Sequence, residues 1–308
     1  MSSADEFDLI AALSRVHAGA RTPGLEVGIG DDAAVLALGD RLVWTVDAQV
    51  DHVHFERGWL SPEDMGFRAH AAATSDVYAM GATPIAALAS YVLPRDDGAI
   101  AEAIARGSRA SADRHGAHVI GGNLSSGSEL AITTTVLGRC ESPRLRSGAR
   151  AGDGLYVAGP LGHAALGFRA LRDGLRDPRF DPFVACWRRP LLPIDVRAAV
   201  VHASAAIDVS DGLAQDLGHL LAASGLGAEL EAAALHDDDL ARACHETPYA
   251  WLELVLHGGE DYALVCASPS PLPGFRRMGT CTEDRGLRLR STAGHLAVVA
   301  PQGHAHRL

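Results

Sequence analysis

Gly28-Ile29-Gly30-Asp31-Asp32, near the end of the first fifth of the chain, places two carboxylates directly after a glycine turn. Glycines on both sides of an isoleucine let the backbone bend sharply and approach a ligand closely. Carboxylates on such a turn repel phosphate unless a divalent cation lies between them, and Mg²⁺ binds carboxylate and phosphate oxygens together. Alone, this pentapeptide is more often a surface turn with two solvated aspartates. It indicates a phosphate-binding site only if glycines beside carboxylates recur elsewhere in the chain.

Length and composition limit the classes of protein to which the chain can belong. Its 308 residues suffice for two domains, each with its own core, and a hydrophobic content of 47% suits an ordinary globular protein. The net charge of −11 argues against a general nucleic-acid or anionic-membrane partner. All 27 basic residues are arginine, which excludes a P-loop lysine and Schiff-base chemistry.

Cysteine usage and the N-terminal sequence predict the compartment. The five cysteines are odd in number and never spaced as C-x-x-C, so we expect reduced thiols without a disulfide framework or zinc ribbon. Residues 1–6 lack the basic and apolar regions of a secretory signal, and no apolar run has the length of a transmembrane helix. These features predict a cytoplasmic protein.

The first half alternates predicted helices and strands. Ser61-Pro62 is a strong helix start, with an acidic residue, Asp64, three positions after the serine, and this helix should end near Met80 before Gly81. Asp76 lies in its later half, where the helix dipole disfavours an acid, so it is a candidate ligand. The other predicted elements are helices over 5–20 and 97–115, strands over 33–38, 42–47, 117–120 and 131–137, and a glycine turn over 121–123.

The second half starts after a segment rich in Arg, Ser, Pro and Gly over 139–153, so we expect domains over 1–140 and 141–308. Strand–loop–helix patterns recur in both halves, which predicts an α/β or α+β fold. The predicted elements are strands over 154–157, 206–209 and 262–267, helices from the glycine loop 159–162 to 172 and from 211 to 225, and an irregular connection over 173–190.

Acidic residues recur where predicted strands meet loops or helices. Each one alone is best explained as a solvated acid, but three of these positions have glycines beside them, which solvated acids do not need. Glycine backbones that approach phosphate oxygens, with several Mg²⁺ ions between phosphate and carboxylates, explain the combination. The positions are Asp31/Asp32, Asp47, Asp208/Asp211 and Glu260/Asp261, with Asp76 on a helix.

The chain resembles the thiamine-monophosphate kinase family over nearly its whole length. That family belongs to a wider group with aminoimidazole ribonucleotide synthetase, selenophosphate synthetase and the hydrogenase-maturation carbamoyl dehydratase. The last two are disfavoured because this chain lacks a C-terminal cysteine and a reactive cysteine near the N-terminus. The motifs, in family order, are Gly28–Asp32, Asp47 with His54-Phe55, Ser75-Asp76 with Ala79–Ala82, Gly121-Gly122, Asp208–Gly212 with Asp216-Leu217, and Gly258–Tyr262.

The resemblance implies a two-domain fold of the aminoimidazole ribonucleotide synthetase type, whose N-terminal domains pair in a homodimer with ATP bound nearby. It also implies transfer of the γ-phosphoryl group of ATP to thiamine monophosphate by direct in-line displacement, without a covalent nucleophile. The implied residues are Asp32, Thr45, Asp47, Asp76, Asp208 and Asp211 for several Mg²⁺ ions, Gly122, Asn123, Arg146 and Ser210 for ATP, and His54, Glu260 and His304 for the thiamine phosphate.

Several positions depart from the family pattern. Asn123 stands where the family usually has Asp, and one lost charge at about 4 Å is worth on the order of 4 kcal/mol at an effective dielectric of 20. Val46 replaces the usual Thr before Asp47, an Asn expected near Ala73 is absent, and His304 stands where the family's tail carries an aromatic residue. Two alternatives therefore stay open: a related phosphotransferase with another acceptor, and a nucleotide-binding homologue with weakened catalysis.

Two His-x-His pairs offer a rival site. His52 with His54, and His304 with His306, could each present two imidazoles to a transition metal from one strand face. Such pairs are more often ordinary surface residues, so a zinc site is the minor hypothesis here.

Overall fold

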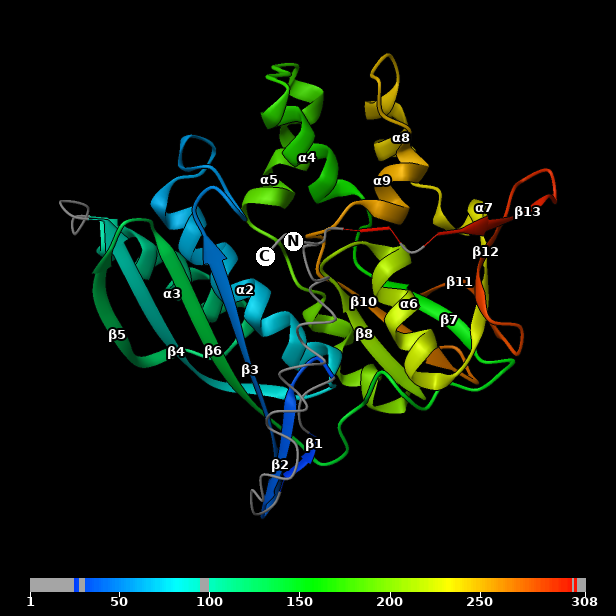
Figure 1. Cartoon of the computed structure of the whole chain (residues 1–308), viewed down its shortest axis with the longest axis horizontal. Coiled ribbons are helices and arrows are strands. Elements are labelled where there is room, and N and C mark those ends of the chain that lie inside the picture. The colour runs from blue at the N-terminus through cyan, green and yellow to red at the C-terminus, as the bar shows by residue number, and fades with distance from the viewer. Residues whose placement is uncertain (1–24, 28–30, 95–99, 301, 304–308) are drawn as a thin grey trace, which may run out of the picture.

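The computed structural model describes residues 25–27, 31–94, 100–300 and 302–303. The helix expected over 5–20, the glycines of the opening turn, and the tail histidines His304 and His306 lie outside these residues. In the part described, the chain forms two halves side by side, each built on its own sheet (Figure 1). Helix α2 (Pro62–Ala79) packs against strands of both sheets and thus forms the junction between the halves.

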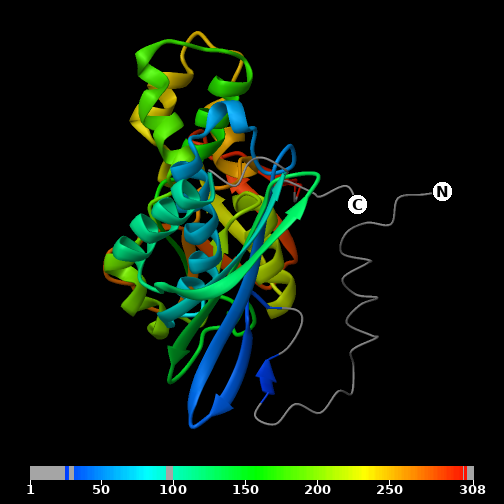
Figure 2. The same ribbon diagram turned by 90° about the vertical axis from the view of Figure 1, so that its left-hand side faces the viewer.

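The first sheet is antiparallel except where β4 pairs with β5 in parallel. Figure 2 shows helices α2 and α3 (Ala101–His115) on one side of this sheet. Side chains alternate accordingly, so that Val43 and Thr45 are buried while Trp44 and Val46 are exposed. The strand order is β1 (Leu25–Val27), β2 (Ala34–Leu38), β3 (Asp40–Val50), β6 (Ala131–Cys140), β4 (Thr83–Pro94) and β5 (Val119–Gly127).

The second sheet holds the larger apolar core. Its strands β7, β8 and β10 are buried on both faces, which explains their continuous apolar sequences. Among the described strands of this sheet, β9 and β12 pair in parallel and the other neighbours pair antiparallel. The strand order is β13 (Leu296–Val299), β12 (Gly286–Arg290), β9 (Gly227–Glu231), β11 (Arg276–Thr282), β7 (Gly154–Ala158), β10 (Ala263–Ser268) and β8 (Ala205–Val209).

Short helices complete the second half. Helices α4, α5, α8 and α9 lie above the sheets in Figure 1, where they form the upper part of the molecule. The helices are α4 (His163–Arg172), α5 (Asp181–Arg188), α6 (Leu213–Ser224), α7 (Ala232–Leu235), α8 (Asp238–Cys244) and α9 (Trp251–His257), with 3₁₀ segments η1 (Arg57–Trp59), η3 (Pro178–Phe180) and η4 (Ile194–His202).

The predicted start and end of the central helix are confirmed. Ser61 Oγ accepts from the Asp64 amide at 3.1 Å and the Asp64 carboxylate accepts from the Ser61 amide at 3.2 Å, which is a complete capping box. The helix ends at Ala79, and Gly81 follows with φ +69°.

The prediction of a glycine turn over residues 121–123 is wrong. These residues lie inside β5, where Gly121, Gly122 and Asn123 pair with residues 88–90 of β4. A Cβ at Gly122 would stand 1.7 Å from the Ala89 carbonyl oxygen, so the glycine serves close strand approach rather than a turn.

Other boundaries also differ from the predictions. The helix expected from Asp211 begins at Leu213, because the Asp211 and Gly212 amides are held by the Asp216 carboxylate instead. Helix α5 lies within the segment expected to be an irregular connection. Strands β4, β9, β11, β12 and β13 were not predicted. The pairing of β4, β9 and β11 depends on partners distant in the sequence, whereas β12 and β13 form a local hairpin.

Candidate functional site

Three aspartates from distant segments meet at the junction of the two halves. Carboxylate oxygens of Asp32, Asp76 and Asp208 all lie within 4.8 Å of one another. Asp76 comes from α2 and Asp208 from the end of β8, and α2 brings them together because it packs against both sheets. Thr45 Oγ1 on β3 donates to Asp76 at 2.5 Å, and Ser75 Oγ donates to Asp208 at 2.6 Å.

Burial of these carboxylates disfavours their ionised forms. It raises the pKa of Asp32 to about 7 and that of Asp76 well above its ordinary value, with repulsion from the neighbouring carboxylates adding to the effect. The pKa of Asp208 is likewise raised by burial, against the hydrogen bond from Ser75. The folded chain therefore holds together acids that repel one another, which is typical of a functional site.

Arg146 partly compensates this charge. Its guanidinium forms an ion pair with Asp32, with Nε at 2.7 Å from Oδ1, and its backbone amide donates to Asp31 at 3.3 Å. Burial alone lowers the pKa of Arg146, but the Asp32 carboxylate outweighs it and raises the pKa above the ordinary value. The sequence predicted Arg146 as a contact of ATP, and the structure places its guanidinium beside the acidic cluster.

The donors of this cluster fit a hard divalent cation. Asp32 Oδ2 is buried and has no hydrogen-bond partner among the described residues, although the carboxylates of Asp76 and Asp208 lie close to it. Oxygen-only donors with uncompensated negative charge are what Mg²⁺ takes, in contrast to the nitrogen and sulfur donors of zinc sites. Magnesium therefore fits the cluster formed by Asp32, Asp76 and Asp208.

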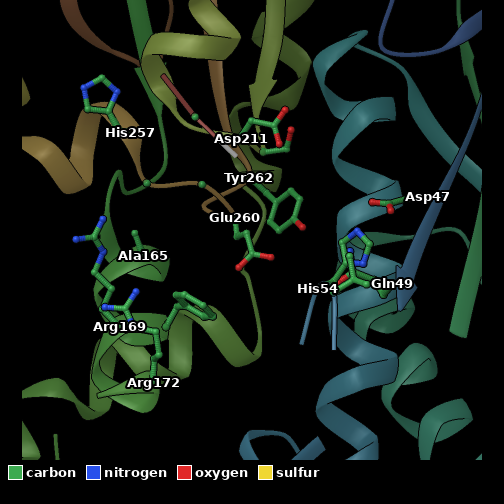
Figure 3. A pocket seen from close by; sticks show the side chains of 16 residues that line it. Asp47, Gln49, His54, Ala165, Arg169, Arg172, Asp211, His257, Glu260 and Tyr262 are labelled. Atoms are coloured by element: carbon green, nitrogen blue, oxygen red, sulfur yellow. The ribbon is translucent and has the colours of Figure 1, made fainter. Parts of the chain in front are cut away.

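A cavity of about 520 Å³ lies beside the cluster. Figure 3 shows Glu260 and Tyr262 facing His54, Gln49 and Asp47 across it. Burial raises the pKa of Asp47 to about 6, so this wall carries a further perturbed carboxylate. The lining includes Asp47, His54, Phe168, Arg169, Arg172, Ser210, Asp211 and Glu260.

His54 is fixed in this wall by a backbone contact. Its Nδ1 accepts from the Val50 amide at 3.1 Å, which leaves the proton on Nε2. His52, two residues earlier, makes a different contact, with Nδ1 at 2.9 Å from the Glu56 carboxylate. His52 instead lies with Asp51 and Glu56, and potential ligand atoms of these three residues are all within 4.8 Å of one another. Zinc binding by the His52 and His54 pair therefore stays a prediction.

The Gly258-Gly259 pair fixes the loop that carries Glu260. A Cβ at Gly259 would stand 2.3 Å from the Ser210 carbonyl oxygen, and one at Gly258 would stand 2.3 Å from Ala165 Cβ. The Glu260 amide donates to that same Ser210 oxygen at 2.7 Å, and Glu260 itself has φ +69°. Close packing thus requires the two glycines and holds Glu260 in a left-handed conformation that side chains rarely adopt.

Gly122 and Asn123 are not part of this cluster within one chain. Three strand spacings, about 14 Å, separate β5 from Asp47 on β3, because β6 and β4 lie between them. Asn123 is exposed and lies in register with Ser90, Thr133 and Ala48, in the row next to that of Asp47 and thus on the opposite face of the sheet.

Several residues of the site carry little or no signal in the sequence. Arg68 of α2 contacts Glu260, and Phe168, Arg169 and Arg172 line the cavity from α4. Arg68 had one usable signal, since it is a lone cation within the Ala-rich part of a predicted helix. The α4 residues had none, because they follow the ordinary amphipathic pattern of a surface helix.

Family models and similar proteins agree with this architecture. Residues 30–140 match the model described as AIR synthase related protein, N-terminal domain, and residues 150–291 match its C-terminal counterpart. A thiamine-monophosphate kinase of Mycobacterium tuberculosis is 39% identical over 285 residues, which cover 87% of this chain and 83% of the relative. One of Aquifex aeolicus is 33% identical, with 90% and 92% covered.

Solved structures of similar proteins have the same fold. A structure described as AaThiL complexed with AMPPCP and TMP has a TM-score of 0.88 at 29% identity, covering 98% of this chain and 97% of the other. Thiamine monophosphate kinase from Aquifex aeolicus has a TM-score of 0.82 at 28% identity, covering 94% and 97%. Hydrogenase maturation protein HypE, at 19% identity and a TM-score of 0.69 over 87% of each chain, shares the fold. Among the described residues, no helix is both long and apolar enough to span a membrane.

Proposed function

Because this chain belongs to the thiamine-monophosphate kinase family, we propose that it transfers the γ-phosphoryl group of ATP to thiamine monophosphate. A phosphate oxygen of the acceptor attacks the γ-phosphorus, the bond to the bridging oxygen of ADP breaks, and the products are thiamine diphosphate and ADP. The observation that carries this proposal is the buried cluster of Asp32, Asp76 and Asp208 beside a cavity lined by Glu260 and His54.

We propose that several Mg²⁺ ions bind at Asp32, Thr45, Asp47, Asp76, Asp208 and Asp211. Bound Mg²⁺ would neutralise charge on phosphate oxygens, which is the main electrostatic requirement of phosphoryl transfer. The chain itself supplies orientation: Thr45 and Ser75 hold the carboxylates of Asp76 and Asp208 in place through their hydrogen bonds. No covalent nucleophile is needed for a direct transfer of this kind.

We propose that both halves contribute to one site. Residues 1–140 would form the domain that binds ATP and Mg²⁺ and pairs in the dimer, and residues 141–308 would form a C-terminal α/β domain that adds further ligands. Arg146 and Ser210 would contact ATP, since an arginine fork matches phosphate geometry. On the acceptor side, the Glu260 carboxylate complements the positive charge of a thiazolium ring, with His54 opposite and His304 as a further contact from the tail.

We also propose that the chain forms a homodimer through the edge strand β5 of the first sheet, whose residues are exposed on both faces, and the exposed sheet surface beside it. Ile120 and Leu124 on β5 are 75% and 65% exposed and Val46 on β3 is 63% exposed, which is unusual for a sheet without a partner. A second copy on this surface explains why Gly122 and Asn123 lie so far from the acidic cluster of their own chain, since the partner's cluster could receive them.

Sedimentation tests the dimer. Leu124→Arg should convert a dimer of the wild-type chain into monomers, because an arginine cannot be buried in an apolar interface without a partner charge. Val298→Arg is the matched control, since Val298 is 81% exposed but lies on β13 of the other sheet. A monomeric wild-type protein, or equal effects of the two substitutions, would refute this interface.

Direct assay tests the activity. The pure protein incubated with ATP, Mg²⁺ and thiamine monophosphate should form thiamine diphosphate, and excess chelator should stop the reaction. Failure under conditions where an authentic thiamine-monophosphate kinase works would reject the proposal. Binding of ATP without product would favour the two alternatives, which differ in whether any phosphate acceptor supports ADP formation.

A further inference from the structure

We infer that Arg68 is a positioning residue that holds Glu260 in the wall of the acceptor cavity and ties this wall to strand β3. The inference rests on the proposed function for the identity of the acceptor. The contacts that carry it are those of a single buried guanidinium that reaches both halves of the molecule.

Each of the three nitrogens of the Arg68 guanidinium has a partner. Nη2 forms an ion pair with Glu260 Oε1, Nε donates to Gln49 Oε1 at 3.2 Å, and Nη1 donates to the Trp187 carbonyl oxygen at 2.5 Å. The guanidinium also lies over the Trp187 ring, 4.8 Å from its centroid. One side chain of α2 thus connects β3, α5 and the loop after α9.

Glu260 receives a second donor from the same group of residues. Trp187 Nε1 donates to Glu260 Oε2 at 2.6 Å, so each carboxylate oxygen has its own fixed partner. Trp187 is fully buried and packs edge-on against Trp59, with Phe168 of the cavity lining beside both rings. The Glu260 carboxylate can therefore rotate only if a buried aromatic group or a buried arginine moves as well.

The two members of the Arg68–Glu260 ion pair have different roles, because they differ in burial. Arginine stays protonated in proteins, and Arg68 has no exposed surface, so its charge requires a carboxylate partner in place of water. Glu260 keeps 29% of its side chain exposed and is thus the member of the pair that still faces the cavity. Arg68 and Trp187 hold the two carboxylate oxygens of Glu260. Glu260 itself lines the cavity (Figure 3).

These contacts predict that a substitution at Arg68 changes the KM for thiamine monophosphate more than the KM for ATP. Arg68→Lys keeps the charge but loses the fork that contacts Gln49, Trp187 and Glu260 together. We expect the KM for thiamine monophosphate to rise about tenfold or more, with the KM for ATP changed less than twofold and kcat less than threefold. Arg109→Lys is the matched control, because Arg109 forms an exposed helix pair with Asp113.

A double-mutant cycle separates positioning from general damage. In the Glu260→Gln background, Arg68→Lys should add less than a twofold further increase in the KM for thiamine monophosphate, since the two residues act through one contact. Trp187→Phe, which keeps an aromatic side chain but removes the indole donor, should raise this KM severalfold. Fully additive effects, or equal changes in the KM for ATP, would overturn the inference.

A spectroscopic measurement tests the contacts without substrate. The chain has four tryptophans, and Trp187→Phe assigns the indole ¹⁵N–¹H resonance of Trp187 by its loss. Glu260→Gln and Arg68→Lys should both shift this resonance, and Arg109→Lys should not. An unchanged resonance would overturn the inference even if the kinase activity is confirmed. If no thiamine diphosphate forms, this resonance still decides whether Arg68 holds Glu260.

Discussion

Replacing Asp76 by Asn should stabilise the metal-free protein while it weakens magnesium binding. Asp76 lies within 4.8 Å of Asp208 and of Asp32, but Asp32 is already paired with Arg146. One ionised neighbour at this distance contributes about 3 kcal/mol of repulsion at an effective dielectric of 20. Asn keeps the oxygen that accepts from Thr45 and removes the charge. We therefore expect about 3 kcal/mol of added stability at pH 8.

The sign of the pH dependence follows from the raised pKa of Asp76. Burial makes this carboxyl harder to ionise in the folded chain than in the unfolded chain. The folded state therefore loses stability as the pH rises above the unfolded pKa of about 4. Wild type and Asp76→Asn should thus differ little near pH 4 and most at pH 8.

Urea and thermal denaturation in excess chelator measure this difference. At pH 8 the midpoint temperature of Asp76→Asn should exceed that of wild type by on the order of 5 °C. Adding Mg²⁺ should raise the midpoint of wild type much more than that of the variant, since binding to the folded state alone adds stability. Asp113→Asn is the control, because Asp113 is exposed on α3 and pairs with Arg109.

Two results would refute this reasoning. If Asp76→Asn destabilises the chelated protein at pH 8, the three carboxylates do not repel one another as their distances imply. If Mg²⁺ stabilises wild type and variant equally, Asp76 does not contribute to a cation site.

Two further predictions concern the elements that carry the site. Ser61→Ala removes the capping box of α2 and should lower the free energy of unfolding by about 1 kcal/mol in urea denaturation, without changing the KM for ATP; an unchanged stability would contradict the capping argument. Gly259→Ala places a Cβ 2.3 Å from the Ser210 carbonyl oxygen, so it should displace Glu260 and raise the KM for thiamine monophosphate at least tenfold, whereas Gly58→Ala, with open space around it, should not.

Local sequence patterns predicted the elements that depend on neighbouring residues. The Ser61 cap, the Pro62 start and the Gly81 stop of α2 are specified within a few residues, because capping involves only the local backbone. Strands with continuous apolar sequences, such as β8 and β10, were found for the same reason. Strands β4 and β9 were not found, since their residues become a strand only when distant partners pair with them.

Of the candidate site, too, some parts could be predicted from the sequence and others depend on the tertiary structure. Asp32, Asp76 and Asp208 were identified from acids at element ends and from the order of the motifs, and the structure brings these three together. Arg146 was predicted as a contact of ATP, and its ion pair with Asp32 is a contact that only the structure shows. Asn123 was expected in a glycine turn and instead lies on β5, because register with β4 determines its place.

The sequence by itself determined which chemistry the chain carries: many carboxylates beside glycines, arginine as its sole basic residue besides histidine, and motifs in the order of one family. Only the tertiary structure decided which of these groups meet. Arg68 and Glu260 are 192 residues apart, and they pair because α2 packs against both sheets. Backbone dihedrals and side-chain alternation are local properties, but the contact between two faces is a property of the whole packed chain.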